Sequence, residues 1–143
     1  MKQQLNEETK VIRVINATAA GSTPINGTVI DMQNWDGVRF IAALGALTAT
    51  QVTNLKAQQG AAANGSDAAD IVGAVTGNAA DGDSNKVLLL DVCEPTGRYV
   101  RCVLGRATAL AVVDGVTAEL YRGRTSGFAQ DATVSQVKTL KAP

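Results

Sequence analysis

Short β-prone runs separated by turn-forming residues recur along this chain of 143 residues. The clearest example is residues 28–44, T-V-I-D-M-Q-N-W-D-G-V-R-F-I-A-A-L, where two apolar runs flank an Asn34-Trp35-Asp36-Gly37 turn. Short strands with turn signals about every ten residues are typical of sandwiches and barrels. The sequence therefore predicts an all-β fold: an antiparallel β-sandwich, either jelly-roll-like or immunoglobulin-like, with extended N- and C-terminal arms.

The same pattern locates the individual strands. We expect them near 10–15, 28–31, 37–44, 51–58, 69–75, 86–93, 98–106, 109–114 and 116–122. Asn26-Gly27 and Asp114-Gly115 both favour tight hairpins, because these residue types tolerate positive φ. The alanine-rich region 42–63 alternates from Gln51 onward, which favours strands, and one short helix there stays an open alternative.

The polar ends of the chain do not follow the strand pattern. We expect an N-terminal arm over residues 1–9, one sandwich domain over 10–122 and a C-terminal arm over 123–143. Polar termini are often disordered. Extended segments with apolar residues at intervals can instead pair with the sheet edge of a neighbour, and both interpretations stay open.

The charges balance overall but not locally. Thirteen basic and thirteen acidic residues give a net charge of zero, which disfavours nucleic acid and anionic membranes as partners. Residues 60–97 carry six acids and one base, net −5, and residues 98–124 carry five arginines and two acids, net +3. These segments form either a solvated surface or complementary patches between neighbouring copies.

The residue types argue against catalysis. The chain has no histidine, the commonest general base and metal ligand. Cys93 and Cys102 flank a Pro95-Thr96-Gly97 hairpin turn, and strand alternation points the first thiol outward and the second inward, so both are expected to be reduced. No phosphate-binding glycine motif is present. We expect no enzyme and no cofactor.

One acidic loop resembles a metal site. Asp81-Gly82-Asp83-Ser84-Asn85 looks like the opening of a calcium loop, but Lys86 and Val92 occupy the positions that need Gly and Glu. A looser calcium site built from Asp67, Asp70, Asp81 and Asp83 stays open, although a polar connection is favoured. We therefore predict no metal.

Five arginines interleave with tyrosines near the C-terminal half. Arg98, Arg101, Arg106, Arg122 and Arg124 accompany Tyr99 and Tyr121. A stacking face for single-stranded nucleic acid is one interpretation, but such proteins are usually basic. Forked pairs with carboxylates of a neighbour, such as Asp67, Asp70 or Glu94, fit the balanced charge better.

The polar start, M-K-Q-Q-L-N-E-E-T-K, has no apolar signal core. No run approaches the roughly 20 apolar residues that span a bilayer. We expect a protein made in a cytoplasm, without export by the usual route.

Three segments carry a resemblance to a known family. I-D-M-Q-N-W-D-G-V-R-F (30–40), N-K-V-L-L-L-D-V-C-E-P-T-G-R-Y-V-R-C-V-L (85–104) and Q-D-A-T-V (130–134) resemble small virion proteins of tailed bacteriophages, including head decoration, or cement, proteins. The resemblance implies a β-rich module made in the bacterial host cytoplasm and placed on the outside of the phage head, commonly as a homotrimer. Its partners would be the major capsid protein and copies of itself, and it would stabilise the expanded shell without any reaction.

The subunit or capsid interface is predicted at Trp35, Arg98, Tyr99, Arg101, Arg122, Arg124 and Phe128. For Trp35, burial within the subunit and contact with a partner are both open. Two alternative functions also stay open: a tail, head–tail connector or fibre component, and a carbohydrate-binding module displayed on the virion.

Overall fold

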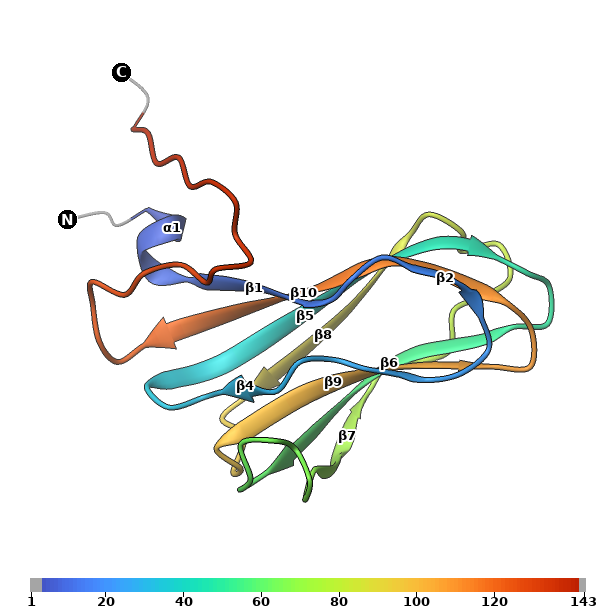
Figure 1. Cartoon of the computed structure of the whole chain (residues 1–143), viewed down its shortest axis with the longest axis horizontal. Helices are drawn as coiled ribbons and strands as arrows, with labels where there is room; N and C mark the ends of the chain where they lie inside the picture. Colours follow the sequence, from blue (N-terminus) through green and yellow to red (C-terminus); the bar gives the residue numbers. More distant parts are fainter. Residues whose placement is uncertain (1–3, 142–143) are drawn as a thin grey trace.

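Two antiparallel β-sheets face one another in the computed structural model, which describes residues 4–141 (Figure 1). Strands account for 52% of the chain and helix for 3%. The predicted all-β sandwich is confirmed. Residues 1–3 and 142–143, which the predicted arms include, lie outside the described residues.

Within residues 4–141, one helical turn and ten strands follow in chain order. They are α1 (Leu5–Glu8), β1 (Lys10–Ile15), β2 (Thr18–Gly21), β3 (Ile25–Asn26), β4 (Ile30–Asp31), β5 (Trp35–Leu47), β6 (Val52–Gly60), β7 (Ala69–Val75), β8 (Val87–Cys93), β9 (Tyr99–Ala107) and β10 (Ala111–Gly123). Most of the alanine-rich region 42–63 is strand, as the alternation predicted. Among the described residues, no helix is long and apolar enough to cross a membrane.

The strand order is that of a jelly roll. The first sheet has the order β1-β10-β5-β8, with β2 also pairing β10, and the second has the order β3-β9-β6-β7, with β4 also pairing β9. Consequently β1 pairs with β10, β3 and β4 with β9, β5 with β8, and β6 with β7, as in one long hairpin rolled around itself. This order selects the jelly roll over the immunoglobulin arrangement.

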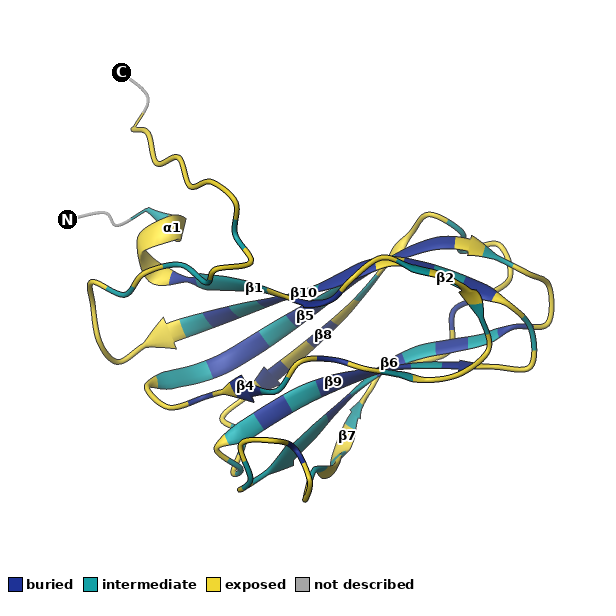
Figure 2. Ribbon diagram, viewed as in Figure 1, coloured by how far each residue is buried: buried dark blue, intermediate teal, exposed yellow. Residues whose placement is uncertain are grey.

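Alternating side chains from both sheets fill the core. Figure 2 shows buried positions alternating with intermediate or exposed ones along the strands. Phe40 on β5 and Leu104 on β9 are fully buried. Cys102 on β9 also points inward, and burial raises the pKa of its thiol to about 12. Cys93 is exposed and both cysteines are free, as alternation predicted.

The predicted hairpin at Asp114-Gly115 is wrong. Strand β10 runs through both residues and pairs with β5 from Ala111 to Gly123, with register shifts on either side of Val113. Gly115 has a φ of 140°, so the glycine serves a β-bulge instead of a turn. Because the long strand β5 pairs with both halves of β10, these halves do not pair with each other as a hairpin would require.

The structure also differs from the turns predicted at Asn26-Gly27 and at 34–37. At Asn26-Gly27 the chain continues along β9 without reversing: the Gly27 N–H donates to the Cys102 carbonyl at 2.8 Å. A Cβ at Gly27 would lie 2.7 Å from the Cys102 Sγ, so close approach to β9 requires the glycine. The turn before β5 spans 32–35, where the Trp35 N–H donates to the Met32 carbonyl.

The predicted hairpin at 95–97 is also wrong. Strands β8 and β9 belong to different sheets, so the connection at 94–98 crosses from one sheet to the other. Hairpin pairing is excluded because β8 pairs with β5, and β9 pairs with β6 and with the short strands β3 and β4. The conclusion that the two thiols point apart nevertheless holds.

Candidate interaction surface at one end of the sandwich

Three segments distant in sequence meet at one end of the sandwich. They are the turn before β5, the crossover from β8 to β9, and the residues that follow β10, all at the end where α1 lies (Figure 1). We call residues 32–36, 94–99 and 122–128 the end surface. It gathers six of the seven predicted interface residues: Trp35, Arg98, Tyr99, Arg122, Arg124 and Phe128.

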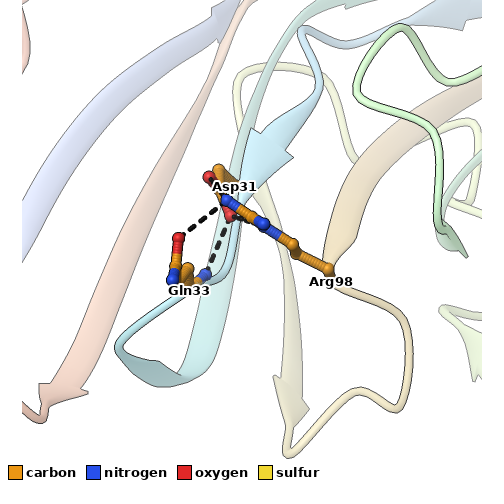
Figure 3. A network of polar contacts seen from close by, with 3 residues as sticks. All are labelled: Asp31, Gln33 and Arg98. Atoms are coloured by element: carbon orange, nitrogen blue, oxygen red, sulfur yellow. Dashed lines mark hydrogen bonds and ion pairs between the residues drawn. The ribbon is translucent and has the colours of Figure 1, made fainter.

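Arg98 makes a forked ion pair within the subunit (Figure 3). Its Nε and Nη2 donate to the two carboxylate oxygens of Asp31, both at 2.9 Å, and Nη2 also donates to the Gln33 Oε1 at 2.7 Å. The side-chain hydrogen bond from Arg98 is the main cause that lowers the pKa of Asp31, and the same bond raises the pKa of Arg98. This forked geometry holds both side chains in fixed positions.

Arg124 closes the opposite side of a shallow groove. Its Nε donates to the Asp36 Oδ1 at 2.9 Å, and its backbone N–H donates to the Asn34 carbonyl at 2.7 Å. The groove has a volume of about 570 Å³ and is lined by residues of all three segments, including Met32, Glu94 and Arg98. Its rim is charged with both signs.

Trp35 and Phe128, two predicted interface residues, contact each other. Their ring centroids lie 4.8 Å apart with the planes at 73°, an edge-to-face pair. Trp35 is half-buried and packs against the hydrophobic core. Its ring also covers Gly123, where a Cβ would lie 3.0 Å from it. Trp35 therefore anchors the first residues after β10 to the sandwich.

Tyr121 organises a second polar cluster, on the outer face of the first sheet. Its hydroxyl donates to the Asp91 Oδ1 at 2.5 Å. The ring crosses Gly37, its cross-strand partner, at a distance that leaves no room for a Cβ. Partial burial and the adjoining Asp91 and Cys93 raise the pKa of Tyr121 well above its ordinary value. A groove of about 890 Å³ lies between this cluster, α1 and residues 122–128.

Arg101, the seventh predicted interface residue, lies apart from the end surface. Arg101 lies on the outer face of the second sheet, where its Nε donates to the Gln58 Oε1 at 2.8 Å. The Gln58 amide donates in turn to Asp70, which also pairs with Lys56 at 3.0 Å. The guanidinium carbons of Arg98 and Arg122 lie 5.2 and 5.9 Å from the rings of Tyr99 and Tyr121.

Arg106 does not belong to any surface cluster. It is 5% exposed and donates to three backbone carbonyls: Nε to Thr23 at 2.9 Å, and Nη1 to Ala19 at 3.0 Å and Ala111 at 2.9 Å. This arginine therefore ties β2 and the residues after it to β10. Its interpretation as part of a stacking face is wrong, because the guanidinium points into the protein.

The acidic loops are organised by their own hydrogen bonds. Asp67 accepts the N–H groups of Ala61 and Ala62 at 2.8 and 3.0 Å, which lowers its pKa. Asp81 accepts from the Thr50 N–H, and Asp83 pairs with Lys86 at 2.8 Å. In residues 4–141, no three His, Cys, Asp or Glu side chains come close enough together to hold a metal ion. The four carboxylates of the looser calcium site are therefore not gathered into one cluster in the described part of the chain.

An apolar patch on the outer face of the first sheet escaped the sequence reasoning. Val87 and Leu89 on β8 are 56% and 54% exposed, and they stand opposite Ala43 and Ile41 on β5. The sequence signal for this patch was the continuous apolar run V-L-L-L (87–90). Such a run places apolar side chains on both faces of its strand, and β8 lies at the edge of its sheet. Exposed apolar patches of this kind mark interaction surfaces.

No protein-family model matches the sequence, and no curated protein is significantly similar to it.

Proposed function

We propose that this chain is a structural virion protein, a head decoration protein that binds the outside of a phage capsid and stabilises the expanded shell. The observation that carries the proposal is the end surface, from which the C-terminal segment leaves the sandwich: Trp35, Arg98 and Arg124 line one groove there, and Arg122, Arg124 and Phe128 line the neighbouring one. The resemblance of residues 30–40 and 85–104 to virion proteins adds to it, since both segments contribute to this surface.

The construction of the end surface suits docking without catalysis. Forked and single ion pairs fix Arg98 and Arg124 before any partner arrives, so little side-chain freedom remains to be lost on binding. Mixed charges around an apolar centre at Trp35 and Phe128 match the usual anatomy of protein interfaces. Arginine and tryptophan are also the residue types that dominate binding energy.

The physical role follows from mass action. A module that binds the expanded capsid and not its precursor stabilises the expanded state by an amount that grows with the logarithm of its free concentration above its Kd. Such a module must be stiff. The rolled hairpin is stiff because each strand of the second sheet is connected along the chain to a strand of the first sheet. The partners in this proposal are the major capsid protein and further copies of this chain, arranged as a closed ring of three.

The experiment compares virions of the phage that carries this gene with virions from which the gene has been deleted. We expect deletion to leave assembled heads that lose infectivity at a lower temperature, and a cryo-electron map to lose density on the outside of the head. Heads of equal heat resistance, or density lost from the tail alone, would contradict the decoration role.

Matched variants connect the phenotype to the end surface. Arg122→Glu reverses an exposed charge in the end surface, and Ala49→Glu places the same residue in the exposed connection at the opposite end of the sandwich. We expect the first variant to lower occupancy on the head and the second to leave it unchanged. Equal occupancy of both variants would place the docking site elsewhere, with the patch around Leu89 as the next surface to test.

A further inference from the structure

The segment after β10 lies beside the open edge of β1 without forming a strand (Figure 1). Among the strands of the described residues, β1 pairs with β10 alone, so its other edge has no strand beside it. Open edges invite pairing with other chains and are usually protected. Here the protection comes from side chains of residues 130–139.

Gln130 is the first attachment. Its Oε1 accepts the Val11 N–H at 2.9 Å, and its Nε2 donates to the carbonyls of Thr9 at 2.7 Å and Asn6 at 3.1 Å. One side-chain amide thus binds backbone groups at three positions of the N-terminal segment. A neighbouring strand would use the same backbone groups of β1.

Thr133 is the second attachment. Its Oγ1 accepts the Arg13 N–H at 3.0 Å. Asp131 holds Thr133 in place by accepting from its N–H at 2.9 Å and from its hydroxyl at 2.8 Å. The N–H groups of Val11 and Arg13 point to the same edge because they are two residues apart. The Q-D-A-T-V segment is therefore an edge-binding motif, which we call the latch.

The contact continues through Asn6, whose Nδ2 donates to the Lys138 carbonyl at 3.0 Å and to the Thr139 Oγ1 at 3.2 Å. Apolar burial adds little in this region: Val137 and Leu140 are 51% and 73% exposed. The latch is thus specific in its hydrogen bonds but buries few apolar side chains, as expected of a contact that opens and closes.

The residues between β10 and the latch have the properties of a hinge. Residues 122–127 are exposed. Arg122 and Gly127 adopt φ values of 52° and 75°, and no atom lies within 4 Å of a Cβ built at Gly127. Arg124 is held by the Asn34 carbonyl and the Asp36 carboxylate, so the hinge is confined to the exposed residues 125–127, before Phe128 reaches Trp35.

We propose that copies of this chain exchange residues 128–139, so that the latch of one copy closes on the β1 edge of another. The contacts described above join residues 128–139 either to residues 6–13 or to Trp35, so a second copy offers an identical docking site. Exchange replaces every bond by its equivalent, and the hinge absorbs the change in direction. Swapping a terminal element in this way is a low-cost route to oligomers.

The proposal concerns the purified protein and stands independently of the decoration role. The first test is the molar mass from light scattering, for wild type and for the double variant Gln130→Ala/Thr133→Ala. The matched control is Ser135→Ala/Gln136→Ala, which alters two exposed residues of the same segment. We expect wild type and control to be oligomers, and the latch variant to be a monomer with an unchanged thermal unfolding transition of the sandwich. A monomeric wild type, or an oligomeric latch variant, would overturn the proposal.

The second test separates exchange from a latch that closes within one chain. Equal amounts of ¹⁴N- and ¹⁵N-labelled protein are unfolded together, refolded and treated with a carbodiimide, which joins carboxylates to nearby amines. Lys10 and Asp131 line the same groove and form the diagnostic pair. If residues 128–139 are exchanged and the two labelled forms associate at random, half of the cross-linked peptide pairs should contain one ¹⁴N and one ¹⁵N peptide. Products of single isotope content only, or no cross-link in an oligomeric sample, would refute it.

Discussion

Replacing Arg106 by Met tests whether a buried arginine holds the jelly roll closed. The guanidinium reaches three carbonyls, on β2, on the residues after β2 and on β10. Methionine keeps most of the stem and its packing, while it removes all three hydrogen bonds. Gly21 lies so close that a Cβ there would be 2.8 Å from the Arg106 Nη2, which indicates that the site is shaped around this side chain.

The magnitude follows from which carbonyls water can reach. The Ala111 carbonyl is buried, and an unsatisfied buried acceptor costs about 2 kcal/mol. Ala19 and Thr23 are exposed residues, so their carbonyls recover water and lose about 0.5 kcal/mol each. We expect a loss of about 3 kcal/mol in the free energy of unfolding, which for a domain of this size lowers Tm by about 10 °C.

Urea unfolding followed by circular dichroism measures this loss. The matched control is Arg101→Met, the same substitution on the outer face of the same strand, where one hydrogen bond to Gln58 is lost. We expect about 0.5 kcal/mol there. If the two variants differ by less than about 1 kcal/mol, the three carbonyl bonds of Arg106 do not stabilise the fold, and the reasoning is refuted.

Three further predictions concern the surface of the sandwich. Gly37→Ala places a methyl group in the space of the Tyr121 ring, and we expect about 1–3 kcal/mol of lost stability with a displaced Tyr121 resonance in NMR spectra; an unmoved resonance contradicts the overlap. The pKa of Asp31 should lie below 3.8 in NMR titrations and return toward that value in Arg98→Ala. Because folding lowers this pKa, the contribution of Asp31 to stability is complete above its unfolded pKa and is lost as the pH falls through its folded pKa. Identical titration midpoints in the two proteins would disprove the pairing. The exposed Cys93 thiol should react with a maleimide in the native protein and the buried Cys102 thiol only after unfolding; equal rates would contradict the burial of Cys102.

Strands were predictable from the sequence because their signal is local. Alternation placed Val100, Cys102 and Leu104 inward on β9, and the structure buries all three. Pairing was less predictable, because it depends on partners far away in the chain. Asp114-Gly115 has the residues of a hairpin, yet thirteen residues of β5 lie alongside both halves of β10. A continuous partner overrides a local turn preference, and the glycine then forms a bulge.

The candidate site divides in the same way. Trp35, Arg98 and Phe128 were predictable as interface residue types, but their meeting at one end depends on the strand order, which no local pattern contains. Arg106 was within reach of sequence reasoning: alternation that buries Cys102 and Leu104 also points Arg106 inward. Its charge favoured a surface interpretation, and only the three carbonyls that accept its hydrogen bonds explain why burial is tolerated.

The intramolecular ion pairs change what the uneven charge distribution means. Residues 60–97 and 98–124 look complementary in sequence, but Arg98 and Arg124 pair with Asp31 and Asp36 of the same subunit, outside the acidic stretch. Attraction between copies therefore draws on less free charge than the totals suggest. The proposed docking would rely more on shape, on apolar side chains and on hydrogen bonds to the backbone of the open edge. The latch offers side-chain hydrogen bonds to the backbone of β1, and the patch around Leu89 offers apolar contact. An oligomer built on both should dissociate little when salt is raised, in contrast to one held by the charged stretches.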